Sequence, residues 1–297
     1  VGEAVMGGLL GGARSQRIVH RLARRCLRSK VAPLAIPRRA TVQIGVENSA
    51  TRAPPRFESK EAERAHSLQR LAATCRIFGR RGFSDGLLGH VTLRDPELPD
   101  HFWVNPVGIA MHQVKVSHLV QVDPLGRVVR GSGMVNPVGL LLHTAVHRAR
   151  PEVNAVCHAH ALHASTWSSF ERRLDPITQD ACIFFENQAL ILAPRVVRDA
   201  ETARRFAEGF GQHRMAIHGG HGIFTTGQTI DEAAWWFVLM NRCCEAQLLA
   251  EAAGTPTQWP PEDARWLASV LGSPTFGWLS FQTLWDEIIR SDPDLVD

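Results

Sequence analysis

The sequence Asn154-Ala155-Val156-Cys157-His158-Ala159-His160 joins a short apolar run to a His-x-His pair. The apolar run has the composition of a buried β-strand, and side chains two residues apart on a strand share a face, so both imidazoles can face one ion. A later Gly-flanked loop, Gly220-His221-Gly222, brings a third histidine. Three histidine ligands leave a coordination position open for water or substrate, as catalytic metal sites require. We therefore expect His158, His160 and His221 to hold a metal ion.

Strands and helices alternate on both sides of this segment. Apolar residues at helical spacing follow the N-cap Ser59, and a long helix opens with Asp231-Glu232 and closes at Gly254. Strands are expected at 90–94, 102–105, 119–122, 127–129, 154–158, 178–185, 189–192, 215–218 and 223–226, and helices at 59–82, 138–149, 162–170, 200–209 and 230–253. This order predicts an α/β domain whose mixed sheet is covered by helices on both faces.

The composition is that of one globular domain with a basic leader. With 44% hydrophobic and 21% charged residues among 297, the chain can bury one substantial core. No run approaches the roughly 20 apolar residues that span a bilayer, so no membrane partner is expected. Residues 1–57 carry eleven Lys and Arg against two acids, whereas the rest of the chain carries 22 against 27.

The arginine-rich leader is typical of an organelle-import presequence, with the mitochondrion as the natural destination, and a solvated disordered tail is the alternative. A nucleic-acid partner is not expected, because the leader has few aromatic residues and the rest of the chain is mildly acidic. Six cysteines without disulfide-framework spacing indicate reduced thiols. We therefore expect an intracellular protein, cytoplasmic or mitochondrial.

The remaining chain is expected to form a domain over residues 58–255 and a helical tail over residues 256–297. The tail carries four tryptophans, Trp259, Trp266, Trp278 and Trp285. Because these aromatic side chains need burial, the tail is expected to pack on the body or on a neighbouring subunit.

Other histidines have weaker claims on the site. His143 and His147 lie one turn apart on a helix, without the intervening glutamate of a hydrolytic zinc helix, and we expect one to line the site and the other to face a neighbour. His163 follows His160 by one turn and either orients the substrate or lies on the helix surface. His90 stands at a Gly-marked strand start, where a ligand can approach, so contact with substrate is expected.

Several segments follow one another between roughly residues 60 and 255. They are Gly82-Phe83-Ser84-Asp85-Gly86-Leu87-Leu88-Gly89-His90-Val91-Thr92-Leu93-Arg94, then Asn136-Pro137-Val138-Gly139 through His143, residues 148–160, and His221-Gly222 with Thr226-Gly227 and the helix at 231–235. In this order they resemble the class II aldolase/adducin family. The resemblance implies a three-layer α/β/α fold around a mixed, largely antiparallel sheet. It also implies a homotetramer with sites near subunit interfaces, and His158, His160 and His221 match the family's metal histidines.

The sequence departs from the aldolase pattern at three points. The resemblance implies an acidic ligand and proton shuttle four positions before His143, but Gly139 stands there. A tyrosine that donates a proton in some members cannot exist in a chain without tyrosine, and the usual Asn before the third metal histidine is Gly220. A general base is therefore missing, and such a loss can slow a proton-transfer step by orders of magnitude.

Glu186 is the candidate replacement for the missing acid, because it follows the strand expected at 178–185 and can point inward; a surface carboxylate is the alternative. Glu186 and His163 thus form the expected catalytic pair. His90, Asn136 and His143 are the residues expected to bind substrate.

Three functions follow from this resemblance. The first is a metal-dependent lyase or decarboxylase that acts on a small oxygenated carbonyl compound or a 2-oxo or 2-hydroxy acid, with one divalent ion. Zn, Fe(II) and Mn all suit a three-histidine site. The second is a non-catalytic, adducin-like scaffold with actin as a partner, and the third is a sugar-phosphate aldolase. Retention of three histidines favours an enzyme, and Gly139 disfavours the aldolase.

Overall fold

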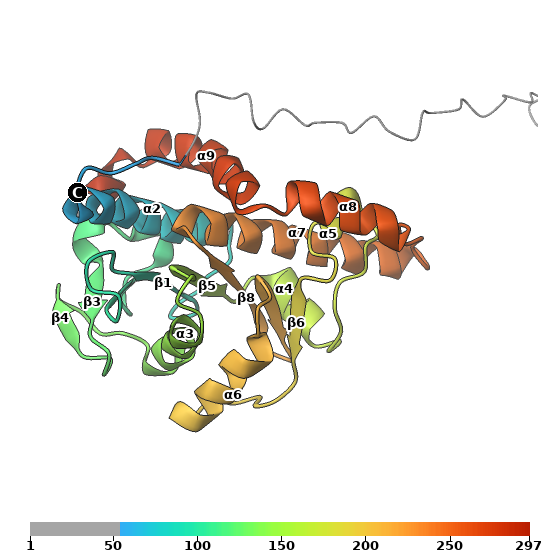
Figure 1. The fold of residues 1–297 in the computed structure, drawn as a ribbon, viewed down its shortest axis with the longest axis horizontal. Helices are drawn as coiled ribbons and strands as arrows, with labels where there is room; N and C mark the ends of the chain where they lie inside the picture. Colours follow the sequence, from blue (N-terminus) through green and yellow to red (C-terminus); the bar gives the residue numbers. More distant parts are fainter. Residues whose placement is uncertain (1–53) are drawn as a thin grey trace, which may run out of the picture. The chain divides into compact units, whose positions relative to one another are not determined.

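One sheet of eight strands lies at the centre of the fold, in the order β4-β3-β2-β1-β5-β8-β7-β6 (Figure 1). The computed structural model describes residues 54–297 of the chain. Every neighbouring pair in this sheet is antiparallel except β6 and β7, which confirms the mixed, largely antiparallel sheet. The strands are β1 His90–Arg94, β2 Phe102–Val104, β3 Val120–Val122, β4 Val128–Arg130, β5 Ala155–Ala159, β6 Gln188–Ile191, β7 Met215–His218 and β8 Gly222–Gly227.

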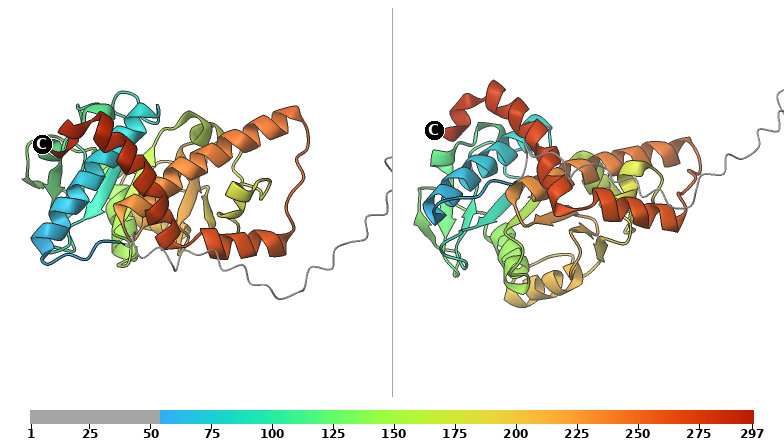
Figure 2. Two further views of the ribbon diagram at one scale, coloured as in Figure 1. Left: turned by 90° about the horizontal axis from the view of Figure 1, so that it is seen from above. Right: turned by 45° about the horizontal axis from the view of Figure 1, so that its top comes forward.

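Helices cover both faces of the sheet, so the predicted three layers are confirmed. On one face α2 and α7 pack on the strands, with α9 against both of these helices, and on the other face lie α3 and α6 (Figures 1 and 2). The helices are α2 Lys60–Arg80, α3 Pro137–Ala149, α4 Leu162–Ser168, α5 Gln179–Cys182, α6 Ala200–Phe210, α7 Ile230–Ala253, α8 Pro261–Leu271 and α9 Pro274–Ser291, and short 3-10 turns cover Met111–Gln113, Val116–His118 and Pro293–Val296.

Strand β5 lies between β1 and β8 in the interior of the sheet, and all of its residues are buried. Ala155 and Cys157 belong to the core beneath α2 and α7, whereas Val156 belongs to the core beneath α3 and α6. A strand that is buried on both faces needs apolar residues at successive positions, which accounts for its continuous apolar run. His158, two residues after Val156, shares the face of α3 and α6.

The strand predicted at 178–185 is wrong, because helix α5 lies there. Thr178 is the N-cap of α5, and its hydroxyl accepts a hydrogen bond from Ala181 N at 3.1 Å. Such a cap and the acidic Asp180 in the first turn both stabilise a helix N-terminus. Cys182 then packs against Ala264 and Leu267 of α8. The apolar residues of this segment therefore meet a helix instead of entering the sheet.

The C-terminal residues form α8 and α9, and they pack on the body of the same chain. Trp278 and Phe281 of α9 are buried, and Phe281 belongs to the core that α2 and α7 share. Arg76 of α2 is bound to Asp294 by two hydrogen bonds, of 3.2 and 2.9 Å. The tail therefore packs on its own chain, which is the first of the two predicted positions. The expected burial of its tryptophans is wrong for Trp259 and Trp266, which are 38% and 48% exposed.

No described helix between residues 54 and 297 is long and apolar enough to cross a membrane. The expected basic leader, residues 1–57, lies outside the described residues as far as residue 53.

Candidate metal centre

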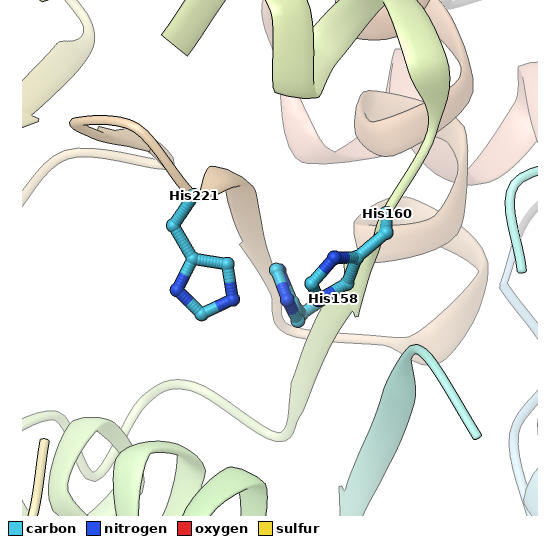
Figure 3. A group of neighbouring side chains, drawn as sticks. All are labelled: His158, His160 and His221. Atoms are coloured by element: carbon cyan, nitrogen blue, oxygen red, sulfur yellow. The ribbon is translucent and has the colours of Figure 1, made fainter. Parts of the chain in front are cut away.

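The three predicted metal histidines come together at one end of the sheet. His158 is near the end of β5, His160 follows that strand, and His221 lies in the turn between β7 and β8 (Figure 3). One nitrogen from each ring can be chosen so that all three lie within 4.8 Å of one another. The ring centroids are 4.8 to 5.0 Å apart, so the three imidazoles surround a common point.

His158 has one ring nitrogen engaged and one free. Nδ1 lies 2.8 Å from Ile223 O, and because a carbonyl oxygen only accepts, Nδ1 carries the proton. In the neutral ring Nε2 then has a lone pair, and this buried atom has no hydrogen-bond partner in the described chain. The ring also stacks on Phe224 at 4.0 Å. Backbone and aromatic contacts thus fix a buried lone pair, as outer-shell contacts do for metal ligands.

His160 and His221 are less buried than His158 and complete the cluster from two loops. Burial lowers the pKa of both rings, and the pKa of His221 falls to about 4 through burial first, and then through His218 and His160. The pKa of His158 is held well below its usual range, chiefly by burial. All three rings are therefore neutral near pH 7, which is the state in which imidazole binds a metal.

Gly222 begins β8 directly after His221. Its φ is +151°, and a Cβ there would meet His158 Cε1 and Ser165 Oγ at 3.6 Å each. Its conformation, more than the space around it, thus favours glycine.

The cluster fits a divalent ion by its donor set. Three imidazole nitrogens suit Zn, Fe(II) and related ions, whose nitrogen ligands lie about 2.0–2.1 Å from zinc, so binding would draw the three rings closer together. The orphaned lone pair of His158 is the observation that favours a ligand at this point. With three neutral donors the charge of the ion is not compensated, and open positions are left for an anionic ligand.

His90 lies opposite His158, as the pairing of β1 with β5 requires. The two ring centroids are 5.0 Å apart, and His90 is 7% exposed. A Cβ on Gly139 would fall 2.3 Å from both Cδ2 and Nε2 of the His90 ring. The space that a side chain at position 139 would need is therefore filled by His90.

His143 does not offer a nitrogen to substrate. Its Nε2 lies 2.9 Å from His90 Nδ1, and its Nδ1 lies 2.8 Å from the hydroxyl of Thr92. The same hydroxyl is 2.9 Å from His147 Nε2. Both histidines of α3 thus face inward, and the expected contact of His143 with substrate is corrected to a contact with His90.

Asn136 is the N-cap of α3, and its side-chain oxygen accepts hydrogen bonds from Val138 N and Gly139 N. It also lines a small cavity beside His90 and the loop that precedes β1, so it lies next to the site. His163 is partly exposed on α4, with Nδ1 3.7 Å from Glu245 Oε2. It lines a cleft of about 900 Å³ along α7 that His158, His160 and His221 do not line.

Glu186 is not placed as a proton donor. Its exposed carboxylate forms a two-pronged ion pair with Arg265 of α8, with hydrogen bonds of 2.9 to 3.1 Å, and this pairing lowers the pKa of Glu186. The expected inward orientation depended on the strand at 178–185, which does not form. The alternative of a surface carboxylate describes its position.

Thr92 and Ser165 are site neighbours that the sequence analysis missed. Thr92 shares a face of β1 with His90, and the period of two along a strand is a signal that could have drawn attention to it. The buried hydroxyl of Ser165 has no partner in the described chain and lies near His158 across Gly222. No sequence pattern indicates Ser165. It lies on α4, and only the packing of this helix against β8 brings its hydroxyl near His158.

The chain matches the family described as the class II aldolase and adducin N-terminal domain over residues 69–248. It is 40% identical to decarboxylase NovR of Streptomyces niveus, over 82% of this chain and 92% of that protein. It is 39% identical to a 4-hydroxy-3-prenylphenylpyruvate oxygenase/4-hydroxy-3-prenylbenzoate synthase of Streptomyces roseochromogenus subsp. oscitans, over 82% and 90%. Among solved structures, an L-fuculose 1-phosphate aldolase from Glaciozyma antarctica PI12 is 36% identical, with a TM-score of 0.77 over 82% of this chain and 96% of that chain.

The fold, the ordered motifs and the match place the protein in one class: it belongs to the class II aldolase and adducin N-terminal domain family. Two relatives that each match 82% of its length are named as enzymes, a decarboxylase and an oxygenase/synthase.

Proposed function

We propose that the protein is a metal-dependent decarboxylase or carbon–carbon lyase that acts on a 2-oxo or 2-hydroxy acid. The observation that carries this proposal is the buried, unpartnered Nε2 of His158 within a cluster of three neutral imidazoles. The names of two relatives that match most of the chain support the reaction class.

His158, His160 and His221 would hold the ion, Zn or Fe(II). When bound, the ion would supply a Lewis acid for a substrate oxygen, or, as iron, a site for dioxygen chemistry. Because none of the three ligands is charged, the site retains the double charge of the ion and favours an anion. A carboxylate next to a carbonyl or hydroxyl offers both the charge and two oxygens on one small molecule.

The first test is elemental analysis of protein that is purified without chelator or histidine tag, followed by a panel of 2-oxo and 2-hydroxy acids. We expect one equivalent of metal per chain and release of carbon dioxide, or cleavage of a carbon–carbon bond, with zinc or with iron and oxygen. Absence of metal after zinc and iron have both been supplied would contradict the proposal.

A sugar-phosphate aldolase is a second candidate, because a solved structure with that title is 36% identical. Position 139 argues against it, since Gly139 offers no acid and His90 fills the adjoining space. Cleavage of L-fuculose 1-phosphate by the zinc-loaded protein would favour this candidate over the decarboxylase.

An adducin-like scaffold is the candidate from a different functional class, supported by the adducin part of the family description. It predicts a stable protein without bound metal that co-sediments with actin filaments. The free nitrogens of the three-histidine cluster support the enzyme instead, because a scaffold gains nothing from a buried unpaired lone pair.

A homotetramer in an intracellular compartment, cytoplasmic or mitochondrial, completes the proposal. Light scattering coupled to size exclusion will give the oligomeric state, and a fluorescent fusion to the C-terminus will report the compartment. A monomer at micromolar concentration would contradict the first part, and secretion would contradict the second.

A further inference from the structure

Four hydrogen bonds connect β1 and α3 to the backbone carbonyl of Val153, and all of the side chains involved are buried. The bonds are His90 Nδ1 to His143 Nε2 (2.9 Å), His143 Nδ1 to Thr92 Oγ1 (2.8 Å), Thr92 Oγ1 to His147 Nε2 (2.9 Å) and His147 Nδ1 to Val153 O (3.1 Å). We call this series the histidine chain. One of its ends lies beside His158, His160 and His221, the three histidines that we call the metal cluster. Its other end is a carbonyl group, which can only accept.

The direction of the histidine chain follows from its carbonyl end. Because Val153 O only accepts, His147 Nδ1 must donate, and Nε2 of the neutral ring is then an acceptor. The Thr92 hydroxyl must donate to that nitrogen, which leaves its oxygen to accept from His143 Nδ1. His143 Nε2 accepts in turn, so His90 Nδ1 must carry the proton. Each neutral ring is thus fixed as the Nδ1–H tautomer.

The opposite direction is costly for a simple reason. If His90 carried its proton on Nε2, every bond of the histidine chain would reverse, and the lone pair of His147 Nδ1 would face the Val153 oxygen at 3.1 Å. Only a second proton on His147 would relieve this repulsion. The positive charge of Arg94, which donates to the backbone oxygen of His147, opposes such a proton.

The three rings are enclosed by the protein, and none has a carboxylate among its hydrogen-bond partners in the histidine chain. His143 is fully buried, and His147 and His90 are 1% and 7% exposed. A buried charge without a counter-ion is costly, so the neutral form of each ring is favoured. A series of neutral rings has a single direction, so the direction derived from Val153 holds along the whole chain.

The free end of the histidine chain is Nε2 of His90. It carries a lone pair, and no residue between 54 and 297 forms a hydrogen bond with it in the structure. The ring is 5.0 Å from the His158 ring between centroids, and it lines the small cavity that Asn136 and the loop before β1 also line. Gly139 of α3 packs closely against this ring, because a Cβ there would fall 2.3 Å from both Nε2 and Cδ2. The ring that carries the unpaired nitrogen thus lies between α3 and the metal cluster.

We propose that His90 Nε2 accepts a hydrogen bond from an O–H group of the ligand held at the three-histidine cluster, and that His143, Thr92 and His147 are positioning residues that act through His90. The inference rests on the proposed function for the ligand, and it names the substrate class further: an acid with a hydroxyl or enol O–H next to the carboxylate. The histidine chain makes His90 an acceptor and prevents it from acting as a donor.

Nitrogen-15 NMR of the full-length, metal-free protein labelled at histidine tests the direction without any assay of activity. Long-range proton–nitrogen correlations distinguish the Nδ1–H from the Nε2–H tautomer. We expect His90, His143 and His147 to be neutral Nδ1–H tautomers at pH 7.5. An Nε2–H tautomer at His90 would overturn the inference, because His90 would then be a donor.

Thr92→Val removes the central hydroxyl at nearly constant shape. We expect the His143 and His90 signals to lose their single tautomer, whereas Thr92→Ser restores it. Thr225→Val is the matched control, because Thr225 is equally buried on β8 but donates to Ala233 O, away from the histidine chain. Unchanged His90 and His143 signals in a folded Thr92→Val protein would show that the hydroxyl does not position His90.

Ligand binding separates this inference from the proposed function. The probes are glycolate, which has the O–H group, and methoxyacetate, which lacks it, each titrated into the zinc-loaded protein. In His90→Phe we expect one zinc per chain as before, while the preference for glycolate over methoxyacetate falls about tenfold, the effect of losing roughly one hydrogen bond. Thr92→Val, which keeps the imidazole, should lose part of the same preference.

The outcomes are distinguishable. If the unaltered protein binds no zinc, the proposed function fails. The NMR experiment on the metal-free protein still tests the tautomers of the histidine chain. If zinc binds and His90→Phe keeps the full preference for glycolate, the inference about His90 fails and the metal site survives. If His90→Phe does not fold, Thr92→Val with its Thr92→Ser rescue decides.

Discussion

Two groups of histidines lie side by side at one end of the sheet, and they differ in what their ring nitrogens do. In the histidine chain, hydrogen bonds engage both nitrogens of His143 and His147 and one of His90. In the metal cluster, Nδ1 of His158 is the one ring nitrogen with a hydrogen-bond partner among residues 54–297. Both groups consist of imidazoles, yet the histidine chain is nearly saturated with hydrogen bonds and the metal cluster is open. Two rings of the cluster, His160 and His221, are also less buried than the rings of the histidine chain.

The difference teaches how to recognise a ligand site. Buried polar atoms almost always have partners, so the exceptions indicate where something is to bind. Helical spacing of His143 and His147 resembles a metal motif, but all four nitrogens are already used. The open nitrogens of the cluster, more than the number of histidines, therefore favour a metal there.

The largest effect is expected from His158→Ala, which removes the fixed lone pair. Zinc affinity should fall by more than the 10–100-fold that loss of an outer-shell partner typically costs. His147→Gln in the histidine chain is the comparison and should keep zinc affinity within about that smaller range. Titration of zinc into both folded variants measures this, and equal losses would erase the distinction between the two groups.

Gly139→Ala should destabilise the protein by about 1–3 kcal/mol, because its Cβ would lie 2.3 Å from the His90 ring and overpack the site. Gly209→Ala in α6 is the control, since its Cβ would meet Ile191 at 3.4 Å or more. A helical glycine with room for a methyl group gains about 0.5–1 kcal/mol on this change. Urea unfolding midpoints give both values, and a neutral Gly139→Ala would mean that His90 can move aside.

Acid should destabilise the metal-free protein through the saturated group. The folded pKa of His90 and of His147 is about 3, below the roughly 6.5 of an unfolded histidine. Their contribution is therefore complete above pH 6.5 and is lost as the pH falls from 6.5 toward 3, by up to about 1.4 kcal/mol per pH unit for each ring. Unfolding free energies between pH 7 and 4 measure the slope, which should become shallower in His147→Gln; an unchanged slope would assign the pH dependence to other groups.

The smallest effect is expected from Glu186→Gln, outside both groups. The ion pair with Arg265 is exposed to solvent and should contribute little to stability, and metal content should not change. Arg265→Gln should match it within error. If Glu186→Gln loses turnover and keeps its metal, Glu186 takes part in the reaction. That result would contradict its observed position on the surface.

The sequence was sufficient for the sheet around β5 and for the metal cluster, because both depend on local patterns. A buried strand followed by His-x-His places two rings by strand periodicity alone, and a Gly-flanked loop suggests the third. Order of motifs then indicated the family and its three layers. Each of these features depends on residues that are close in the sequence, or on motifs that resemble those of the family.

The histidine chain could not be predicted, because it depends on pairing between distant segments. His90 meets His158 only through the register of β1 on β5, and Thr92 meets both helical histidines only after α3 has packed on the sheet. The helix at Gln179–Cys182 was missed because the apolar run at 181–185, which overlaps it, is too short for its composition to distinguish a strand from a helix. Glu186 was then misplaced as a consequence.

Positions 90 and 139 share one volume, so substitutions at the two positions are coupled. A carboxylate side chain at 139 does not fit beside the imidazole at 90 as placed, because even its first carbon would collide with the ring. Removal of the imidazole first would leave a hole beside the site and an unpaired nitrogen on His143. Each single substitution is therefore expected to destabilise the protein. Replacing the histidine at 90 by a carboxylate at 139 requires both positions to change together.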